Sequence, residues 1–195
     1  MSQATRLPAA RRRRQLLDVA QEVFAVQGFH ATSMDEVAEA AGVTKPVLYQ
    51  HFASKRELYL ELLDDVGQQL LGAITTATDT AATPREQVEN GFAAYFRFVR
   101  ERHSAFRVLF GGGARRDEEF ADSVRTVEAA IAEAIAALIE TDIDDEHRRL
   151  LAQGIVGLAE ATARHWMDHG LDLEPDVVAA RVARLAWAGL RAVHG

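Results

Sequence analysis

Basic, aromatic and hydroxyl side chains follow one another closely between residues 42 and 55. The Lys45 ammonium can donate to the acceptor atoms of guanine, and the Val47 side chain can contact the methyl group of thymine. The Tyr49 hydroxyl and the Lys55 ammonium both suit phosphate oxygens. These residue types, so close together, predict a short segment that contacts nucleic acid.

The sequence predicts that a short helix presents these side chains to solvent. Gly42 favours the left-handed backbone conformation that ends a helix, and the Thr44 hydroxyl can cap the next one. Pro46 falls in the first turn, where a missing N–H costs little. Leu48 and Phe52, four residues apart, point into a core. The outward side then carries Thr44, Lys45, Pro46, Val47, Tyr49 and Gln50.

A helix over residues 11–27 and a second helix are predicted before this segment. Apolar residues repeat on one face of the first helix, and Gly28 is its expected stop. Ser33 and Glu36 have the spacing of a capping box and open the second helix. The second and third helices then form a helix-turn-helix, a motif whose second helix reads base edges in the major groove of DNA.

Later parts of the sequence predict helices throughout. Ser54 and Glu57 repeat the capping-box spacing and open a fourth helix, which ends in the polar stretch 75–83. Further apolar stripes predict helices over residues 84–102, 104–110, 117–141, 146–169 and 175–193. We therefore expect an all-α protein of about nine helices. Its DNA-binding domain covers residues 1–54, and the long fourth helix joins this domain to a second domain over residues 55–195.

Four consecutive arginines stand at the start of the first helix: Arg11, Arg12, Arg13 and Arg14. The run predicts either an arm that reaches phosphates or the adjacent minor groove, or a solvated helix start. Residues 1–10, which are mostly small or polar, are expected to be disordered.

The charge of the chain is divided between its two ends. Residues 1–60 carry eight Lys and Arg against six Asp and Glu, whereas residues 61–195 carry fourteen against twenty-three. A basic head on an acidic body fits a protein that contacts DNA with one end. The chain contains no cysteine, which excludes disulfides and thiolate zinc sites. No apolar run approaches the roughly 20 residues of a membrane span, so we expect a cytoplasmic protein, associated with the nucleoid when bound to DNA.

The last two predicted helices interleave bulky apolar residues with glycine and alanine. Small residues let helix axes approach closely, and these helices have more apolar surface than one subunit can cover. A homodimer interface is the expected use of that surface. The residues predicted for it are Leu150, Leu151, Gly154, Gly157, Leu185, Trp187 and Leu190.

Other motifs have weaker chemical interpretations. The glycines 111–113 beside Arg115 suit either a phosphate nest or an inter-helix turn, and no strand or Lys-Ser/Thr pair supports a P-loop. His165 and His169 lie four residues apart next to Asp168, but a histidine pair is two ligands short of a metal site. We therefore predict no metal or cofactor. A helical enzyme finds no support, because no recognisable catalytic arrangement is present.

Residues 32–58 resemble the DNA-binding signature of the tetracycline-repressor (TetR) family, and the resemblance extends over about residues 12–62. The resemblance implies an all-α homodimer that binds a palindromic operator, encloses an effector pocket and pairs its last two helices with those of a partner subunit. By matching position, Lys45, Pro46 and Val47 correspond to base-contacting residues. Thr44, Tyr49, Gln50, His51, Lys55 and either Thr32 or Ser33 complete the predicted contacts with DNA.

A second resemblance involves segments 45–52, 106–110, 154–157, 163–166 and 186–190, which are similar to an actinobacterial regulator of fatty-acid synthesis that binds long-chain acyl-CoA. It implies a long apolar pocket in the second domain. The residues expected to line it are Phe92, Tyr95, Phe96, Val99, Phe106, Phe110, Val127, Ile131, Leu158, Thr162 and Trp166.

These observations predict a transcription factor controlled by an apolar small molecule, such as an acyl-CoA or fatty acid, and acting as a repressor. Two alternatives remain open at this stage. The protein could activate lipid-metabolism genes, or it could bind DNA without control by an effector.

Overall fold

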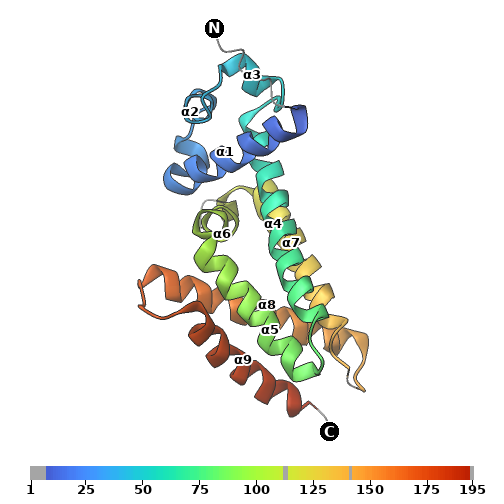
Figure 1. The fold of residues 1–195 in the computed structure, drawn as a ribbon. Helices are drawn as coiled ribbons and strands as arrows, with labels where there is room; N and C mark the ends of the chain where they lie inside the picture. Colours follow the sequence, from blue (N-terminus) through green and yellow to red (C-terminus); the bar gives the residue numbers. More distant parts are fainter. Residues whose placement is uncertain (1–7, 112–113, 141, 194–195) are drawn as a thin grey trace.

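The computed structural model describes residues 8–111, 114–140 and 142–193, and over these residues it is helical throughout (Figure 1). The predicted all-α fold is confirmed. The elements are α1 (Ala9–Ala31), α2 (Met34–Ala40), α3 (Lys45–Tyr49), α4 (Lys55–Asp79), α5 (Pro84–Glu101), α6 (His103–Phe110), a 3-10 turn (Ala114–Arg116), α7 (Glu118–Ala136), α8 (Asp145–Asp168) and α9 (Pro175–Arg191).

The helices of the head begin and end largely where their caps predict. Ser33 and Glu36 form the complete capping box at the start of α2. Gly42 has a φ of 63° after α2, and Gly28 has a φ of 78° that interrupts α1 three residues before its end. The prediction for Thr44 was partly wrong: it is the N-cap residue of α3, but its hydroxyl makes no capping hydrogen bond.

Three predicted boundaries differ from the structure. The expected disordered segment 1–10 overlaps α1, which already includes Ala9, while residues 1–7 lie outside the described residues. α4 continues through 75–79, where the hydroxyls of Thr75 and Thr78 donate to carbonyls one turn earlier, so these polar side chains are satisfied within the helix. α7 ends at Ala136, and Thr141, its predicted last residue, lies outside the described residues.

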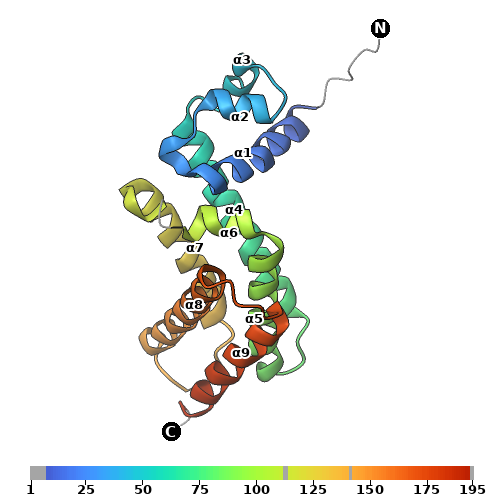
Figure 2. The same ribbon diagram turned by 90° about the vertical axis from the view of Figure 1, so that its left-hand side faces the viewer.

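The molecule consists of a head, made by α1 to α3, on a longer helical body (Figures 1 and 2). α4 starts beneath the head and extends into the body, where it packs against α5 and α7. α5 also packs along α9, and α7 packs along α8. α4 and α7 therefore both connect the base of the head to the interior of the body.

An aromatic cluster joins the head to the body. Phe24 and Phe29 of α1 contact Tyr59 of α4, and the Phe29 ring lies 4.7 Å from the Phe120 ring of α7. The Tyr59 hydroxyl donates to the Val108 carbonyl over 3.3 Å, and burial raises its pKa to about 12. Edge-to-face aromatic contacts of this kind add to the stabilisation from hydrophobic burial, so the cluster helps to hold the head on the body.

Candidate nucleic-acid interface and apolar pocket

One face of α3 is free at the end of the head farthest from the body (Figure 1). Leu48 and Phe52 are fully buried and fix the helix on the core of the head, as their spacing predicts. Tyr49 is 43% exposed, and Lys45 and Pro46 are also exposed. Thr44 and Gln50 belong to the same exposed surface, and Val47 is half-buried at its edge.

Bonds within the head already occupy two of the polar groups predicted to contact DNA, those of Lys45 and Thr32. The Lys45 ammonium forms an exposed 2.9 Å ion pair with Asp35, and this hydrogen bond raises the pKa of Lys45. Thr32 is buried, and its hydroxyl donates to the Gly28 carbonyl over 2.9 Å. Ser33 is exposed at the N-terminus of α2. Of the two residues proposed by the resemblance, only Ser33 is exposed, and its hydroxyl donates to the Glu36 carboxylate over 2.8 Å.

Lys55 is held inside the head rather than extended into solvent. Its ammonium donates to the carbonyls of Phe29 and Thr32 over 2.8 and 2.7 Å and lies 4.4 Å from the centre of the Phe29 ring. These bonds satisfy carbonyls at the end of α1 and use two of the three ammonium donors. His51 is half-buried, and its ring tilts against Phe52. Lys55 thus has a structural role that the sequence motif did not reveal.

The four arginines at the start of α1 divide into two pairs. Arg13 pairs with Glu61, donates to the His51 carbonyl and covers the Phe52 ring. Arg14 pairs with Asp18 on its own helix and with Asp65 on α4. These two arginines tie α1 to α4. Arg11 is exposed, and Arg12 is half-buried with a hydrogen bond to Gln15, so these two are the better placed for a phosphate.

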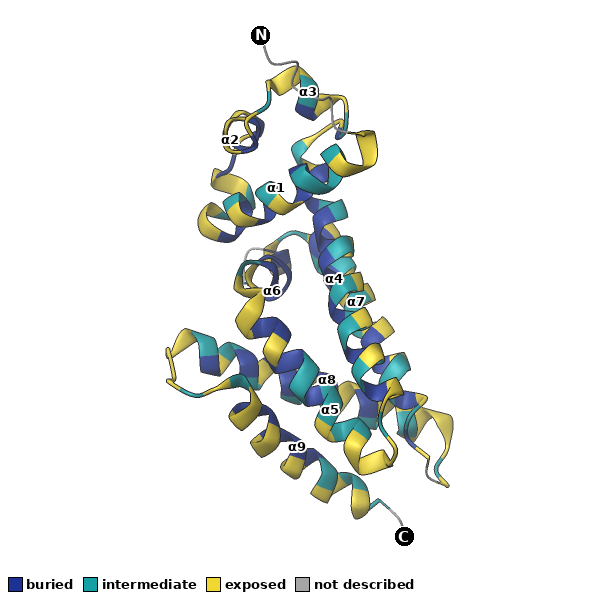
Figure 3. Ribbon diagram, in the orientation of Figure 1, coloured by how far each residue is buried: buried dark blue, intermediate teal, exposed yellow. Residues whose placement is uncertain are grey.

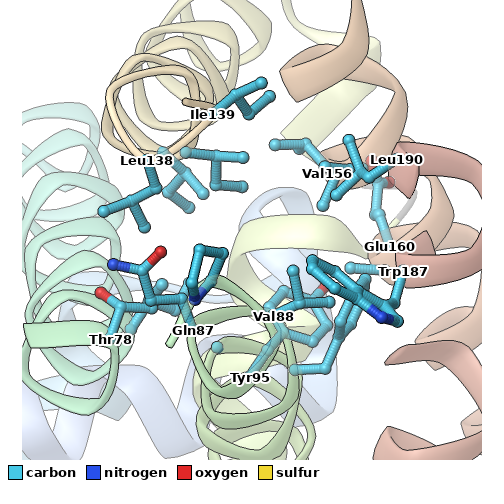
Figure 4. A pocket seen from close by; sticks show the side chains of 18 of the residues that line it. Thr78, Gln87, Val88, Tyr95, Leu138, Ile139, Val156, Glu160, Trp187 and Leu190 are labelled. Atoms are coloured by element: carbon cyan, nitrogen blue, oxygen red, sulfur yellow. The ribbon is translucent and has the colours of Figure 1, made fainter. Parts of the chain in front are cut away.

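The body encloses a cavity of about 220 Å³ among α4, α5, α7, α8 and α9 (Figure 4). Apolar side chains dominate its wall. The lining residues are Ile74, Thr78, Pro84, Gln87, Val88, Gly91, Phe92, Tyr95, Phe110, Ile131, Ile135, Leu138, Ile139, Glu140, Ile155, Val156, Ala159, Glu160, Trp187, Leu190 and Arg191. A concave apolar site with few polar groups is the usual form of a small-molecule site.

The cavity has an exposed end and a buried end. Pro84, Glu140 and Arg191 are exposed and mark the mouth, whereas Tyr95 and Phe110 are buried at the other end. The lining residues of α5 recur every three or four positions, so the cavity follows one face of that helix. The rise of an α-helix places Pro84 and Tyr95 about 16 Å apart. The cavity wall is therefore elongated along α5, over about three turns.

Four of the residues predicted to line the pocket do so: Phe92, Tyr95, Phe110 and Ile131. The other predicted residues do not line this cavity. Phe96, Val99, Phe106 and Trp166 are buried in the core, Val127 packs against Gly67, and Leu158 and Thr162 are half-buried on α8. Spacing along α5 could have found Gln87 and Gly91, but apolar periodicity does not tell a cavity wall from filled core.

Few polar side chains reach the cavity, and one of them lacks a partner. The Tyr95 hydroxyl is buried and makes no hydrogen bond. Burial, and secondly the charge of Glu160, raise its pKa. Glu160 is itself buried and pairs with Arg164, while the Thr78 hydroxyl donates to the Thr75 carbonyl. Figure 4 shows Tyr95 on α5 and Glu160 on α8 among the lining side chains.

An uncovered face runs along α8 and α9 (Figure 3). Leu150 is 70% exposed and Leu185 is 64% exposed, and a Cβ added at Gly154 or Gly157 would meet no atom within 4 Å. These four predicted interface residues lie on the surface. The structure places the other three differently, because Trp187 and Leu190 line the cavity and Leu151 is half-buried against the core.

Neither the histidine pair nor the glycine run forms a recognisable binding site among the described residues. The rings of His165 and His169 lie 4.2 Å apart, and among the described residues no group of three or more potential ligands could hold a metal ion. Of the proposed phosphate nest, Gly112 and Gly113 lie outside the described residues. None of the helices in the described part of the chain is long and apolar enough to cross a membrane.

Comparison with known proteins finds relatives of both the head and the helical body. Residues 16–62 match the family model of bacterial regulatory proteins of the tetR family, and residues 84–189 match a tetracyclin repressor-like C-terminal domain. The HTH-type transcriptional activator FasR of Mycolicibacterium smegmatis is 35% identical over 187 residues, which are 95% of this chain and 85% of FasR.

Two solved structures share the fold. A TetR-like transcriptional regulator from Rhodococcus sp. RHA1 has a TM-score of 0.79 at 34% identity, covering 95% of this chain and 99% of that one. FadR from Bacillus subtilis, solved in complex with stearoyl-CoA, has a TM-score of 0.79 at 19% identity, covering 89% and 96%. With a family model over more than half of its length and FasR aligned over nearly all of it, the chain belongs to the TetR family of DNA-binding transcriptional regulators, which are not enzymes.

Proposed function

We propose that this protein is a homodimeric regulator whose affinity for operator DNA is controlled by a long-chain acyl compound bound in the body. The observation that carries the proposal is the elongated apolar cavity, which is open at Pro84 and Arg191 and closed at Tyr95. Its walls include α4 and α7, the helices that connect to the head, so a ligand in the cavity can change the position of the head.

The shape and lining of the cavity support an acyl chain as the ligand. Its length of about 16 Å along α5 accommodates about a dozen carbon atoms, given C–C bonds of about 1.5 Å in a zigzag. FadR, which shares the fold, was solved with stearoyl-CoA. The mouth carries the Arg191 guanidinium as well as the Glu140 carboxylate, and the guanidinium suits the negative charge of a fatty acid or of the coenzyme A part of an acyl-CoA.

The DNA contacts that we propose follow the exposure of the head. Lys45, Pro46 and Val47 face base edges, and Tyr49 and Ser33 face phosphates. His51 and Gln50 flank this surface, and Arg11 and Arg12 reach the backbone beside it. In a dimer built on the exposed face of α8 and α9, two such heads read a palindromic operator with half-sites about 34–36 Å apart.

Two helices can carry the signal from cavity to head. α4 extends from Ile74, which lines the cavity, to Lys55, which holds the end of α1. α7 extends from Ile131 on the cavity wall to Phe120 in the aromatic junction. A ligand that separates α4 from α7 changes the position of the head, and a shift of a few ångströms in each head breaks the simultaneous fit to both half-sites.

The sign of regulation has two candidates. The first is repression, the sign predicted from the sequence, in which ligand binding releases the operator. The second is activation. FasR, which is similar over most of the chain, is described as an activator, and this observation favours a protein that raises transcription when it is bound to its operator. Transcription in vitro from a promoter carrying the operator separates them, because added protein lowers the transcript level in the first case and raises it in the second.

The proposal is tested by measuring ligand and DNA binding on the same dimer. The operator is selected from a random duplex library, and its binding is followed by fluorescence anisotropy while palmitoyl-CoA or palmitate is added. Trp187, which lines the cavity, reports ligand binding directly through its fluorescence. We expect saturable binding and an operator affinity changed about five- to 150-fold, the usual range of allosteric coupling.

Val88→Phe, which fills the cavity, should remove the response to ligand while operator binding persists. Val26→Phe, at a 75% exposed position on α1, is the matched control and should respond as the wild type does. Long-chain ligands that fail to bind, or that bind without changing operator affinity, would contradict the proposal.

A separate experiment tests the contacts with DNA. Tyr49→Phe removes one exposed hydroxyl and should weaken binding to all sequences, whereas Lys45→Met should relax the base preference at one position. Replacing both Arg11 and Arg12 by Gln should reduce the slope of log K against log salt by about 2. Unchanged binding by all three variants would show that another surface contacts DNA.

A further inference from the structure

The buried end of the cavity holds a hydrogen-bonding group that an alkyl chain would not use. Tyr95 lines the cavity, and its hydroxyl is buried without a hydrogen-bond partner. A buried hydroxyl that lacks a hydrogen bond is destabilising in a folded protein, and such groups are rare. Phe at this position would keep the apolar wall without that cost, so the hydroxyl requires an explanation.

The charges around Tyr95 limit the kind of partner that it can take. Two carboxylates and one guanidinium surround Tyr95: Glu160 and Arg164, which form an ion pair on α8, and Glu128 on α7. A carboxylate placed here would be repelled by this net negative environment. A neutral oxygen, either carbonyl or hydroxyl, can accept the Tyr95 hydrogen bond without that repulsion.

The distance of Tyr95 from the mouth of the cavity indicates where along the ligand this oxygen lies. The mouth of the cavity, with Arg191 and Glu140 exposed, is about 16 Å away along α5. A carboxylate or thioester at the mouth is therefore about a dozen carbon atoms from the Tyr95 hydroxyl. One polar group of the ligand cannot serve both ends of the cavity.

Resting on the acyl-chain function proposed above, we infer that the preferred ligand carries a second, neutral oxygen near the far end of its chain, where the Tyr95 hydroxyl donates a hydrogen bond to it. The ligand class is then a long-chain acid or acyl thioester with a distal hydroxyl or keto group. A plain saturated chain occupies the same cavity and leaves Tyr95 without a partner.

The test compares three probes of equal chain length on the full-length protein: dodecanoate, ω-hydroxydodecanoate and dodecanedioate, followed by the fluorescence of Trp187. The hexadecanoate set is measured in parallel to cover a longer reach. We expect ω-hydroxydodecanoate to bind about five- to tenfold more tightly than dodecanoate, and dodecanedioate to bind most weakly. In Tyr95→Phe the preference for the hydroxyl should disappear or reverse, because the buried hydroxyl then lacks a donor.

Tyr59→Phe is the control, since it removes a tyrosine hydroxyl at the junction and should keep the wild-type order of the three probes. If the plain chains bind but the hydroxylated ones bind no better in either set, or if Tyr95→Phe keeps the preference, this inference is wrong and the acyl-chain function stands. If none of the probes binds and acyl-CoAs also fail, the acyl-chain function is wrong.

Discussion

The contact between α4 and α7 offers a sharp test of how the body is held together. At Gly67 of α4, an added Cβ would lie 2.3 Å from Cγ2, 3.0 Å from Cγ1 and 3.2 Å from Cβ of Val127 on α7. Ordinary contacts between carbon atoms are about 3.5–4.0 Å long. Gly67→Ala therefore requires α7 to move by about 1 Å, and a new Val127 rotamer does not suffice because its Cβ is also too close.

Two opposing effects determine the change in stability. Alanine is favoured over glycine within a helix by about 1 kcal/mol, whereas overpacking a core costs about 1–3 kcal/mol. Three short distances to a stiff, β-branched side chain place this site toward the upper end of that cost. We expect Gly67→Ala to lower the free energy of unfolding by about 1–2 kcal/mol.

The matched control lies on the same helix. Gly72 is exposed, and a Cβ added there meets no atom within 4 Å, so Gly72→Ala should stabilise the protein by about 1 kcal/mol from helix propensity alone. Adding Val127→Ala to Gly67→Ala should recover about 1 kcal/mol beyond the sum of the single changes, because the new methyl group then has room.

Urea unfolding followed by circular dichroism measures all four variants. If Gly67→Ala stabilises the protein as much as Gly72→Ala does, the close approach of α4 to α7 is not present in solution and the reasoning fails. Since Val127 lies one turn from Ile131 on the cavity wall, Gly67→Ala should also weaken the response of operator binding to ligand.

Three further predictions concern stability and assembly. Tyr95→Phe removes a buried hydroxyl without a partner and should stabilise the unliganded protein by about 1 kcal/mol, whereas Tyr59→Phe loses a bond to a backbone carbonyl and should cost about 1 kcal/mol in urea unfolding. The bond from Arg56 holds the pKa of Asp117 below its ordinary value. The stabilisation by this ion pair is therefore complete above about pH 4 and is lost as the pH falls through the lowered pKa of Asp117. Between about pH 5 and pH 2, the free energy of unfolding of Arg56→Gln should therefore fall less than that of the wild type in the same assay. Leu185→Glu should yield monomers in analytical ultracentrifugation with the helical circular dichroism unchanged.

Each of these three predictions can fail in a definite way. Equal stability of the two tyrosine variants would show that the Tyr95 hydroxyl has a partner in solution. Parallel acid unfolding of wild type and Arg56→Gln would mean that the link between α4 and α7 at Asp117 adds nothing. A dimer that persists in Leu185→Glu and also in Leu150→Glu would place the interface elsewhere.

Much of the head could be predicted from local sequence, because its helices begin and end through contacts a few residues apart. The Ser33–Glu36 capping box and the left-handed Gly42 depend only on their immediate neighbours, and both are present as expected. Lys55 shows where such reasoning ends. Its ammonium bonds carbonyls of residues 29 and 32, and no pattern around residue 55 indicates that the end of α1 lies beside it.

The sequence by itself determined the all-α class, the family, the exposed face of α3 and the presence of an apolar interior in the body. These features follow from helical periodicity, caps and a contiguous motif. Which apolar residues enclose empty space was decided only by the tertiary structure. Phe92 and Phe96 lie on the same helix with the same chemistry, yet one lines the cavity and the other fills the core. A cavity exists where several helices fail to meet, and that distance is a property of their packing rather than of any one segment.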